Sequence, residues 1–169
     1  MRDMRRLWPL IVLLCWARGD ARAQQASLLV SELLYQPFSG EAEYVELYNP
    51  ADTAVDLAGY RIVRVLHDSL ATHYPLPSHS VAPHSFVVLT RDAASVTSRY
   101  DVKYPPHLVE CALPTYPNDG GSVVVATPDT LVVDRFDYSP SMHSRLLHNK
   151  AGVSLERRDY GRPASDPSN

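Results

Sequence analysis

The spacing of apolar residues is the feature that most limits how this chain can fold. From residue 27 onward, apolar residues alternate with polar ones or form short continuous runs, and a sustained period of 3.6 residues is almost absent. Pro, Gly, Asn and Asp are grouped between these segments, where they indicate turns. This pattern, without helices long enough for crossover connections, predicts an all-β fold: an antiparallel β-sandwich or barrel. The expected strands are residues 28–34, 43–48, 60–66, 86–90, 122–126, 131–136 and 153–157.

Two of these segments indicate how the strands face the core. Within 44–48, Val45 and Leu47 fall on one face, which we expect to point into the core, while the alternate side chains fall on the other. The segment 122–126 is apolar on both faces. Such a strand is typical of the centre of a sheet that is covered on both sides.

The connections contain one turn and one short helix that the residues predict. Asp119, Gly120 and Gly121 supply the positive-φ residues that a tight hairpin needs. A calcium loop would instead require dense Asp/Asn alternation and a closing glutamate, which are absent from this segment. A single helical turn is expected over 92–100, with Asp92 as its N-cap.

Residues 1–23 have the three parts of a secretory signal peptide. Three arginines give a positive start, residues 7–17 form an apolar run, and Ala21-Arg22-Ala23 has the small-x-small form of a cleavage site. The apolar run is shorter than the ~20 residues of a membrane-spanning helix. We therefore expect cleavage before Gln24, export to the cell envelope or the medium, and no stable membrane span afterwards.

Charge and cysteine content narrow the function further. The whole chain has 16 basic and 19 acidic residues, and removal of residues 1–23 leaves 11 basic against 17 acidic, a net charge of −6. This balance argues against a nucleic-acid partner, because nucleic-acid-binding domains are usually basic.

Cys15 would leave with the signal peptide, so Cys111 has no disulfide partner. The exported domain must be held together by its hydrophobic core.

The order of motifs along the chain carries a family resemblance. The segments that carry it are residues 29–35, 43–50, 55–60, 73–76, 81–89, 118–126, 132–138 and 153–157. In this order they resemble the lamin tail domain in its bacterial secreted form. The resemblance implies an immunoglobulin-like β-sandwich, here assigned to residues 24–160. It also implies structural roles for Glu46, Asn49, Asp56, Gly59, Asp119, Gly120, Gly121 and Glu156.

The chain departs from the family pattern at two places. Ala82-Pro83-His84 stands where the family usually has Pro followed by Gly, so the turn type there is open. Relatives continue from the 153–157 strand to a Trp and a further strand, whereas this sequence stops at Asn169. We therefore expect residues 161–169 to be a truncated segment of a longer protein.

Catalytic and metal-binding patterns are weak. Glu43 and Glu46 lie three positions apart, an odd number, so a strand places them on opposite faces. A structural role is therefore favoured for Glu46, with Arg61 or a backbone N–H as its partner. No G-x-S-x-G motif or glycine-rich phosphate loop occurs, and Cys111 lies in an apolar run where it is expected to fill the core. The sequence therefore predicts no enzyme and no cofactor.

Histidines leave one metal hypothesis open. Four of them could cluster on two neighbouring strands and their turn: His67, His73, His79 and His84. None has a paired spacing such as H-x-H, so surface or turn positions are the favoured interpretation.

Tyrosines offer the best candidate for a binding surface. Tyr104, Tyr116 and Tyr138 lie near Pro-rich loops and are predicted to form a ligand face, because tyrosine combines a flat apolar ring with a polar tip. The expected function is a non-catalytic exported module for protein interaction, tethering or scaffolding within a larger secreted or cell-surface protein. The alternatives are a carbohydrate- or polymer-binding accessory module of a secreted hydrolase, and an anchor for an envelope assembly. The expected partner is a protein or a surface polymer.

Overall fold

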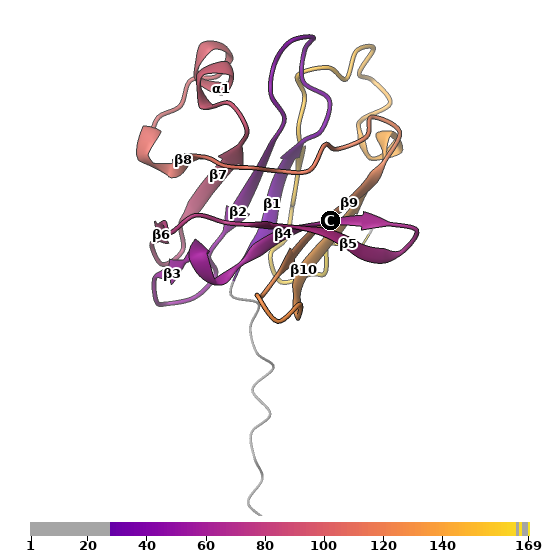
Figure 1. Ribbon diagram of the computed structural model, residues 1–169. Coiled ribbons are helices and arrows are strands. Elements are labelled where there is room, and N and C mark those ends of the chain that lie inside the picture. The colour runs from indigo at the N-terminus through magenta and orange to yellow at the C-terminus, as the bar shows by residue number, and fades with distance from the viewer. Residues whose placement is uncertain (1–27, 165, 167–168) are drawn as a thin grey trace, which may run out of the picture.

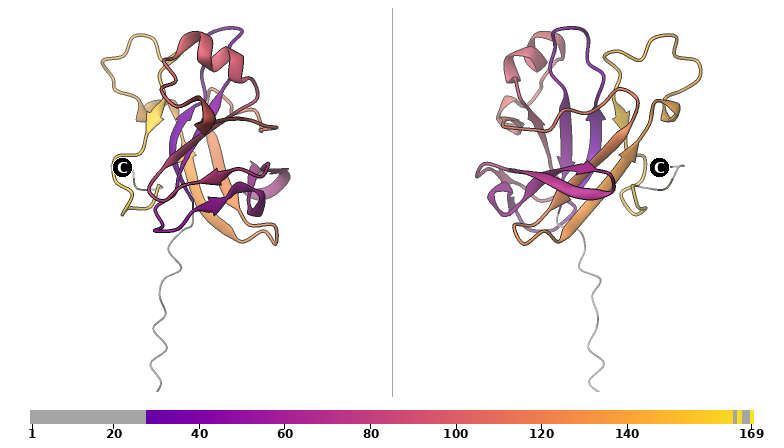
Figure 2. Two further views of the ribbon diagram at one scale, coloured as in Figure 1. Left: turned by 90° about the vertical axis from the view of Figure 1, so that its left-hand side faces the viewer. Right: turned by 45° about the vertical axis from the view of Figure 1, so that its right-hand side comes forward.

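Two β-sheets pack face to face in the computed structural model, which describes residues 28–164, 166 and 169 (Figures 1 and 2). The first sheet has the order β11-β1-β2-β7-β8 and the second has the order β10-β9-β4-β5. The strands of the first sheet are β1 (Leu29–Leu34), β2 (Tyr44–Tyr48), β7 (Phe86–Thr90), β8 (Leu108–Glu110) and β11 (Leu155–Glu156). The strands of the second sheet are β4 (Arg61–Leu66), β5 (Ser69–Pro75), β9 (Gly121–Ala126) and β10 (Val132–Tyr138).

Smaller elements lie in the connections between the strands. A two-stranded ribbon pairs β3 (Val55–Asp56) with β6 (Ser80–Val81). The one α-helix within the described residues, α1 (Ala93–Arg99), begins after Asp92, whose Oδ1 accepts a hydrogen bond from the Ser95 N–H at 2.9 Å, as the sequence predicts. Short 3₁₀ turns occupy Leu57–Gly59, Pro105–His107 and Pro140–Met142.

All seven strands that the apolar pattern predicts are present with small shifts at their ends, whereas it does not predict β3, β5, β6 and β8; of these, the family resemblance implies a strand at 73–76, which overlaps β5. One correction concerns strand direction, because β7 and β8 pair in parallel and the sandwich is therefore not purely antiparallel. Parallel neighbours require a crossover connection. The connection between β7 and β8, which contains the short helix α1, provides it, although the sequence pattern predicts no helix long enough for that role.

The core lies between the sheets and consists of alternate residues from both. Val45 and Leu47 are fully buried there, which confirms the predicted facing of β2. Strand β9 is central in its sheet, and Val123 to Ala126 are fully buried on both faces. The second face of β9 belongs to a small cluster with Val63. The prediction of a doubly covered central strand is thus confirmed.

The glycine turn before β9 is not the hairpin that the sequence predicts. The preceding strand β8 belongs to the other sheet, so residues 111–120 cross between the sheets instead of joining paired neighbours. Gly120 has a positive φ of 123°, but Gly121 does not. A Cβ on Gly121 would lie 3.0 Å from Tyr138 Oη, so close packing against that ring is the constraint there.

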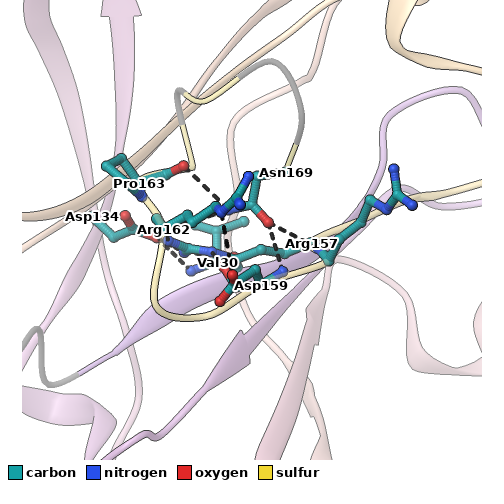
Figure 3. Close-up of polar contacts among 8 residues, drawn as sticks. Val30, Asp134, Arg157, Asp159, Arg162, Pro163 and Asn169 are labelled. Atoms are coloured by element: carbon teal, nitrogen blue, oxygen red, sulfur yellow. Dashed lines mark hydrogen bonds and ion pairs between the residues drawn. The ribbon is translucent and has the colours of Figure 1, made fainter.

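A buried ion pair connects β10, an edge strand of the second sheet, to the residue after β11, an edge strand of the first (Figure 3). Asp134 Oδ2 on β10 accepts hydrogen bonds from the Val30 N–H of β1 and from Arg157 Nη1, both at 2.9 Å. Arg157 follows β11, and its Nη1 also donates to the Val30 carbonyl at 3.3 Å. The two charged side chains are only 6% and 11% exposed, for Arg157 and Asp134 respectively. We call Val30, Asp134 and Arg157 the sheet clamp.

The chain after the sheet clamp folds back on itself. Asn169 Oδ1 accepts hydrogen bonds from the Arg158 and Asp159 N–H groups at 3.0 and 2.7 Å (Figure 3). The predicted signal peptide, residues 1–23, lies outside the described residues. Within the part of the chain that the structure describes, no helix has the length and apolar character needed to cross a membrane.

Candidate interaction groove

A groove of about 550 Å³ runs across the outer face of the first sheet. Its floor is a row of side chains in direct cross-strand register on β1, β2, β7 and β8: Glu32, Glu46, Val88 and Leu108. Helix α1 has only seven residues and covers only one end of this face, where Val96 packs on Leu34 and Tyr44. Three inter-strand spacings make the floor about 14 Å long. We call this feature the sheet groove.

Aromatic and apolar side chains line the sheet groove beside its floor. Tyr44 and Tyr100 meet edge to face with their ring centroids 6.0 Å apart. At the β8 end, Tyr104 stacks on His107 at 5.8 Å, and Tyr104 is 69% exposed. Phe86 lines the groove near its other rim. The volume of the sheet groove lies within the range of about 300–1,000 Å³ that is usual for ligand sites.

Three glutamates stand in one row across β11, β1 and β2. Glu32 is directly opposite Glu156 on one side and Glu46 on the other. We call these three residues the glutamate row. Like charges that face each other across strands are destabilising. No Arg, Lys or His of the described residues forms an ion pair with any of them.

Neutral hydroxyl groups are the hydrogen-bond donors to the glutamate row. Ser31 Oγ donates to Glu46 Oε1 at 2.8 Å, and Tyr44 Oη donates to Glu32 Oε1 at 2.5 Å. The sequence suggested Arg61 or a backbone N–H as the partner of Glu46. Arg61 is wrong because it lies on β4 of the opposite sheet. Burial is the main cause that raises the pKa of Glu46 to about 7; the Ser31 hydroxyl lowers this pKa, and the neighbouring carboxylates of Glu32 and Glu156 raise it.

The stability of the protein should therefore depend on pH through Glu46. The folded state binds the Glu46 proton more tightly than the unfolded chain, in which the pKa of this carboxyl is 4.5. The stabilisation from the bound proton is therefore complete below pH 4.5 and is lost as the pH rises through about 7. Glu46→Gln cannot ionise. Between pH 4 and pH 8, the free energy of unfolding of wild type should therefore fall by about 1 kcal/mol more than that of Glu46→Gln. This value is reduced for solvent screening. Urea unfolding at both pH values measures this.

Asp68→Asn is the matched control, because its side chain is almost fully exposed. It should show no such difference between the two pH values. If Glu46→Gln and wild type differ by the same amount at pH 4 and pH 8, the proposed ionisation of Glu46 is wrong.

The predicted tyrosine face does not form. Tyr116 and Tyr138 are only 2% and 4% exposed and belong to the core, whereas Tyr104 is at the rim of the sheet groove. The physical reason is that residues 111–120 cross the end of the sandwich. There the Tyr116 N–H donates to Glu43 Oε1 at 3.0 Å, and Tyr138 Oη donates to the Pro117 carbonyl at 2.9 Å.

Two of the residues assigned structural roles organise loops by hydrogen bonding. Asn49 is fully buried, and its Nδ2 donates to the carbonyls of Thr53, Val81 and Ala82 at 2.9–3.1 Å. Asp56 accepts hydrogen bonds from the Ala58 and His79 N–H groups and from Ser78 Oγ, at 3.0–3.1 Å. These backbone hydrogen bonds lower the pKa of Asp56.

The remaining assignments differ in outcome. Gly120 uses its positive φ, and Gly121 packs on Tyr138. Gly59 has no positive φ and has space around a would-be Cβ, so glycine is not required at this position. Asp119 is exposed in the loop that crosses between the sheets. Glu156 is exposed on β11 and belongs to the glutamate row.

The four histidines do not come together. Among the described residues, no group of three His, Cys, Asp or Glu side chains could hold a metal ion. His84 instead lies 2.9 Å from Asp52 and 3.4 Å from the Tyr48 hydroxyl. The φ of 51° at His84 shows that this turn contains a left-handed residue, a conformation that glycine adopts most readily.

Cys111 and Glu43 have packing and hydrogen-bonding roles. Cys111 packs against the core as expected, and burial raises its pKa to about 11, so the thiol is neutral at pH 7. Glu43 pairs with Arg91 at 2.9 Å, away from the groove that Glu46 lines.

The sequence interpretation missed Glu32, Val88 and Leu108 as groove residues. A signal was available: β1, β2 and β11 each carry a glutamate among apolar residues, in Leu-Leu-Val-Ser-Glu, Tyr-Val-Glu-Leu and Ser-Leu-Glu. Only the strand register shows that these glutamates are direct neighbours.

The stacked sheets and the open groove on one outer face define a β-sandwich module of the immunoglobulin-like type. Residues 21–140 match the family model of the Lamin Tail Domain, which covers more than half of the chain. The chain therefore belongs to the lamin tail domain family, as the order of its motifs predicts. No curated protein matches the chain.

Proposed function

We propose that this chain is a non-catalytic exported module that mediates protein interaction, tethering or scaffolding within a larger secreted or cell-surface protein. The observation that carries the proposal is the sheet groove, whose floor combines the apolar side chains of Val88 and Leu108 with two glutamates that form no ion pair within the described residues. Export is supported by the signal-peptide pattern of residues 1–23.

The groove is suited to binding because its floor is rigid. Its four floor residues lie on hydrogen-bonded neighbouring strands rather than on loops. A preorganised surface loses little conformational entropy when a partner binds. Val88 and Leu108 are half-buried and supply apolar area, while the aromatic rings along the groove add rigid contact surface.

A carbohydrate or polymer ligand is the second candidate. An aromatic cluster on the same sheet face consists of Tyr48, Phe86 and Tyr160. The ring centroid of Tyr48 lies 4.8 Å from that of Phe86 and 4.4 Å from that of Tyr160. Phe86 and Tyr160 are exposed. Aromatic rings at a surface offer the flat apolar area on which sugar rings stack.

Retention of the purified chain on immobilised envelope proteins and on immobilised polysaccharides tests both candidates. Val88→Glu places a charge on the groove floor and should reduce retention on the protein fraction at least tenfold. The matched control Ala71→Glu lies exposed on β5 of the opposite sheet and should leave retention unchanged. Far-ultraviolet circular dichroism checks that both variants are folded.

The outcomes separate the candidates. Equal retention of Val88→Glu and wild type on the protein fraction would refute the groove as the interaction surface. Retention on polysaccharide that Tyr160→Ala abolishes would establish the second candidate instead.

A further inference from the structure

We propose that the occupant of the sheet groove is a protein segment that places an arginine or lysine side chain against Glu46 and Glu32 and an apolar side chain against Val88 and Leu108. This inference rests on the interaction function proposed above and specifies the chemistry of the partner.

Charge complementarity identifies the cationic part of the partner. The glutamate row places three carboxyl groups side by side without a basic residue of the described chain paired to them. Glu46 uses Oε1 for the Ser31 hydroxyl, and no described residue donates to its Oε2. A cation bound here would remove the repulsion between facing carboxylates and would donate to Glu46 Oε2.

The other end of the groove has no comparable excess of charge. The other charged residues of the lining, Asp101 and Lys103, have opposite charges that offset each other, and His107 is stacked on Tyr104. The unbalanced negative charge is therefore confined to the β1–β2 end. This asymmetry gives the bound segment a direction, with its basic residue over β1 and β2 and its apolar residue over β7 and β8.

The lining favours an organic cation over a metal ion. The described residues contain no group of three ligands for a metal. Rings of Tyr44, Phe86 and Tyr100 line the groove. A guanidinium or ammonium group is attracted to aromatic faces, and a guanidinium can also bind a carboxylate through two parallel hydrogen bonds.

The length of the floor sets the spacing within the partner segment. A floor of about 14 Å corresponds to about four residues of extended chain at 3.3 Å per residue. The basic and apolar side chains of the partner should therefore be three to four positions apart. A single free cation, such as arginine itself, would fill only one end of the groove.

Nuclear magnetic resonance titration of the purified chain with two synthetic peptides tests the proposal. The first is acetyl-GGRAALVGG-amide, and the second has citrulline, the neutral analogue of arginine, in place of arginine. The arginine peptide should shift the backbone amide signals of Glu46, Val88 and Leu108. The citrulline peptide should bind at least tenfold more weakly.

Variants locate the cation within the groove. Glu46→Gln should weaken binding of the arginine peptide at least tenfold, whereas Asp68→Asn, which removes one negative charge from an exposed turn of the opposite sheet, should not. The bound arginine peptide should also lower the pKa of Glu46 from about 7, which the carboxyl carbon signal reports.

Each outcome bears on a different level of the proposal. Equal binding of both peptides would overturn the cationic partner while leaving the groove as an interaction surface. Binding of neither peptide would overturn the proposed occupant, even if Val88→Glu loses retention on envelope proteins. Unchanged retention of Val88→Glu would instead refute the proposed function itself.

Discussion

Asp134→Ala should lower the free energy of unfolding by about 3–5 kcal/mol, because it leaves a buried guanidinium without its counter-charge. Arg157 is 6% exposed, and Asp134 is its only carboxylate partner among the described residues. The change also removes the acceptor of the Val30 N–H, which connects β10 to β1. Urea unfolding at pH 7 measures the loss.

Two further variants make the interpretation specific. Asp137→Ala, on the same strand, breaks an ion pair with Arg135 in which both side chains are more than a third exposed, and should cost only about 0–1 kcal/mol. The double variant Asp134→Ala/Arg157→Ala should cost less than the sum of its single changes, since neither charge is then left buried alone. A loss for Asp134→Ala no greater than that for Asp137→Ala would show that the sheet clamp does not hold the sheets together.

Asn49→Asp should lower the free energy of unfolding by about 3 kcal/mol although the two side chains have nearly the same shape. The buried Nδ2 group of Asn49 donates to three carbonyl oxygens, from the turn after β2 and from the β6 region. An aspartate oxygen at that position would face those carbonyls without a donor. The loss should be smaller at pH 3, where a protonated carboxyl can donate once.

Asn118→Asp is the control for this prediction, because Asn118 is exposed in a loop. Substitutions at such positions usually change stability by less than about 0.5 kcal/mol. Thermal and urea unfolding of both variants should agree on the difference. Comparable stability of Asn49→Asp and wild type at pH 7 would mean that this amide does not organise the β2–β6 connection.

The regular part of the fold was accessible from the sequence. Alternation at 44–48 placed Val45 and Leu47 in the core, and continuous apolar character identified the central strand β9. Both inferences depend only on side-chain periodicity, which each strand carries by itself. The apolar pattern does not predict strand β5, of which only the part at 73–76 is implied by the family resemblance, because an exposed edge strand has no need of a continuous apolar pattern.

The candidate site was less accessible. Tyr116 and Tyr138 were assigned to an exposed face from their neighbourhood of prolines, but the crossing segment 111–120 carries Tyr116 into the core. The sheet groove depends on which strands are neighbours. No local pattern in β1, β2 or β11 indicates that their glutamates meet.

What the sequence by itself determined is the class of fold, the family and the inward face of most strands, because hydrophobic periodicity and turn residues act over a few neighbouring positions. Only the tertiary structure decided the partners of the charged groups. A β-bulge between Val132 and Asp134 breaks the alternation of β10, and Asp134 meets Val30 and Arg157. A second bulge between Val30 and Glu32 breaks the alternation of β1, where the Ser31 hydroxyl reaches Glu46. Such bulges and the strand register arise from contacts between distant segments, so they become visible only when the two sheets are assembled.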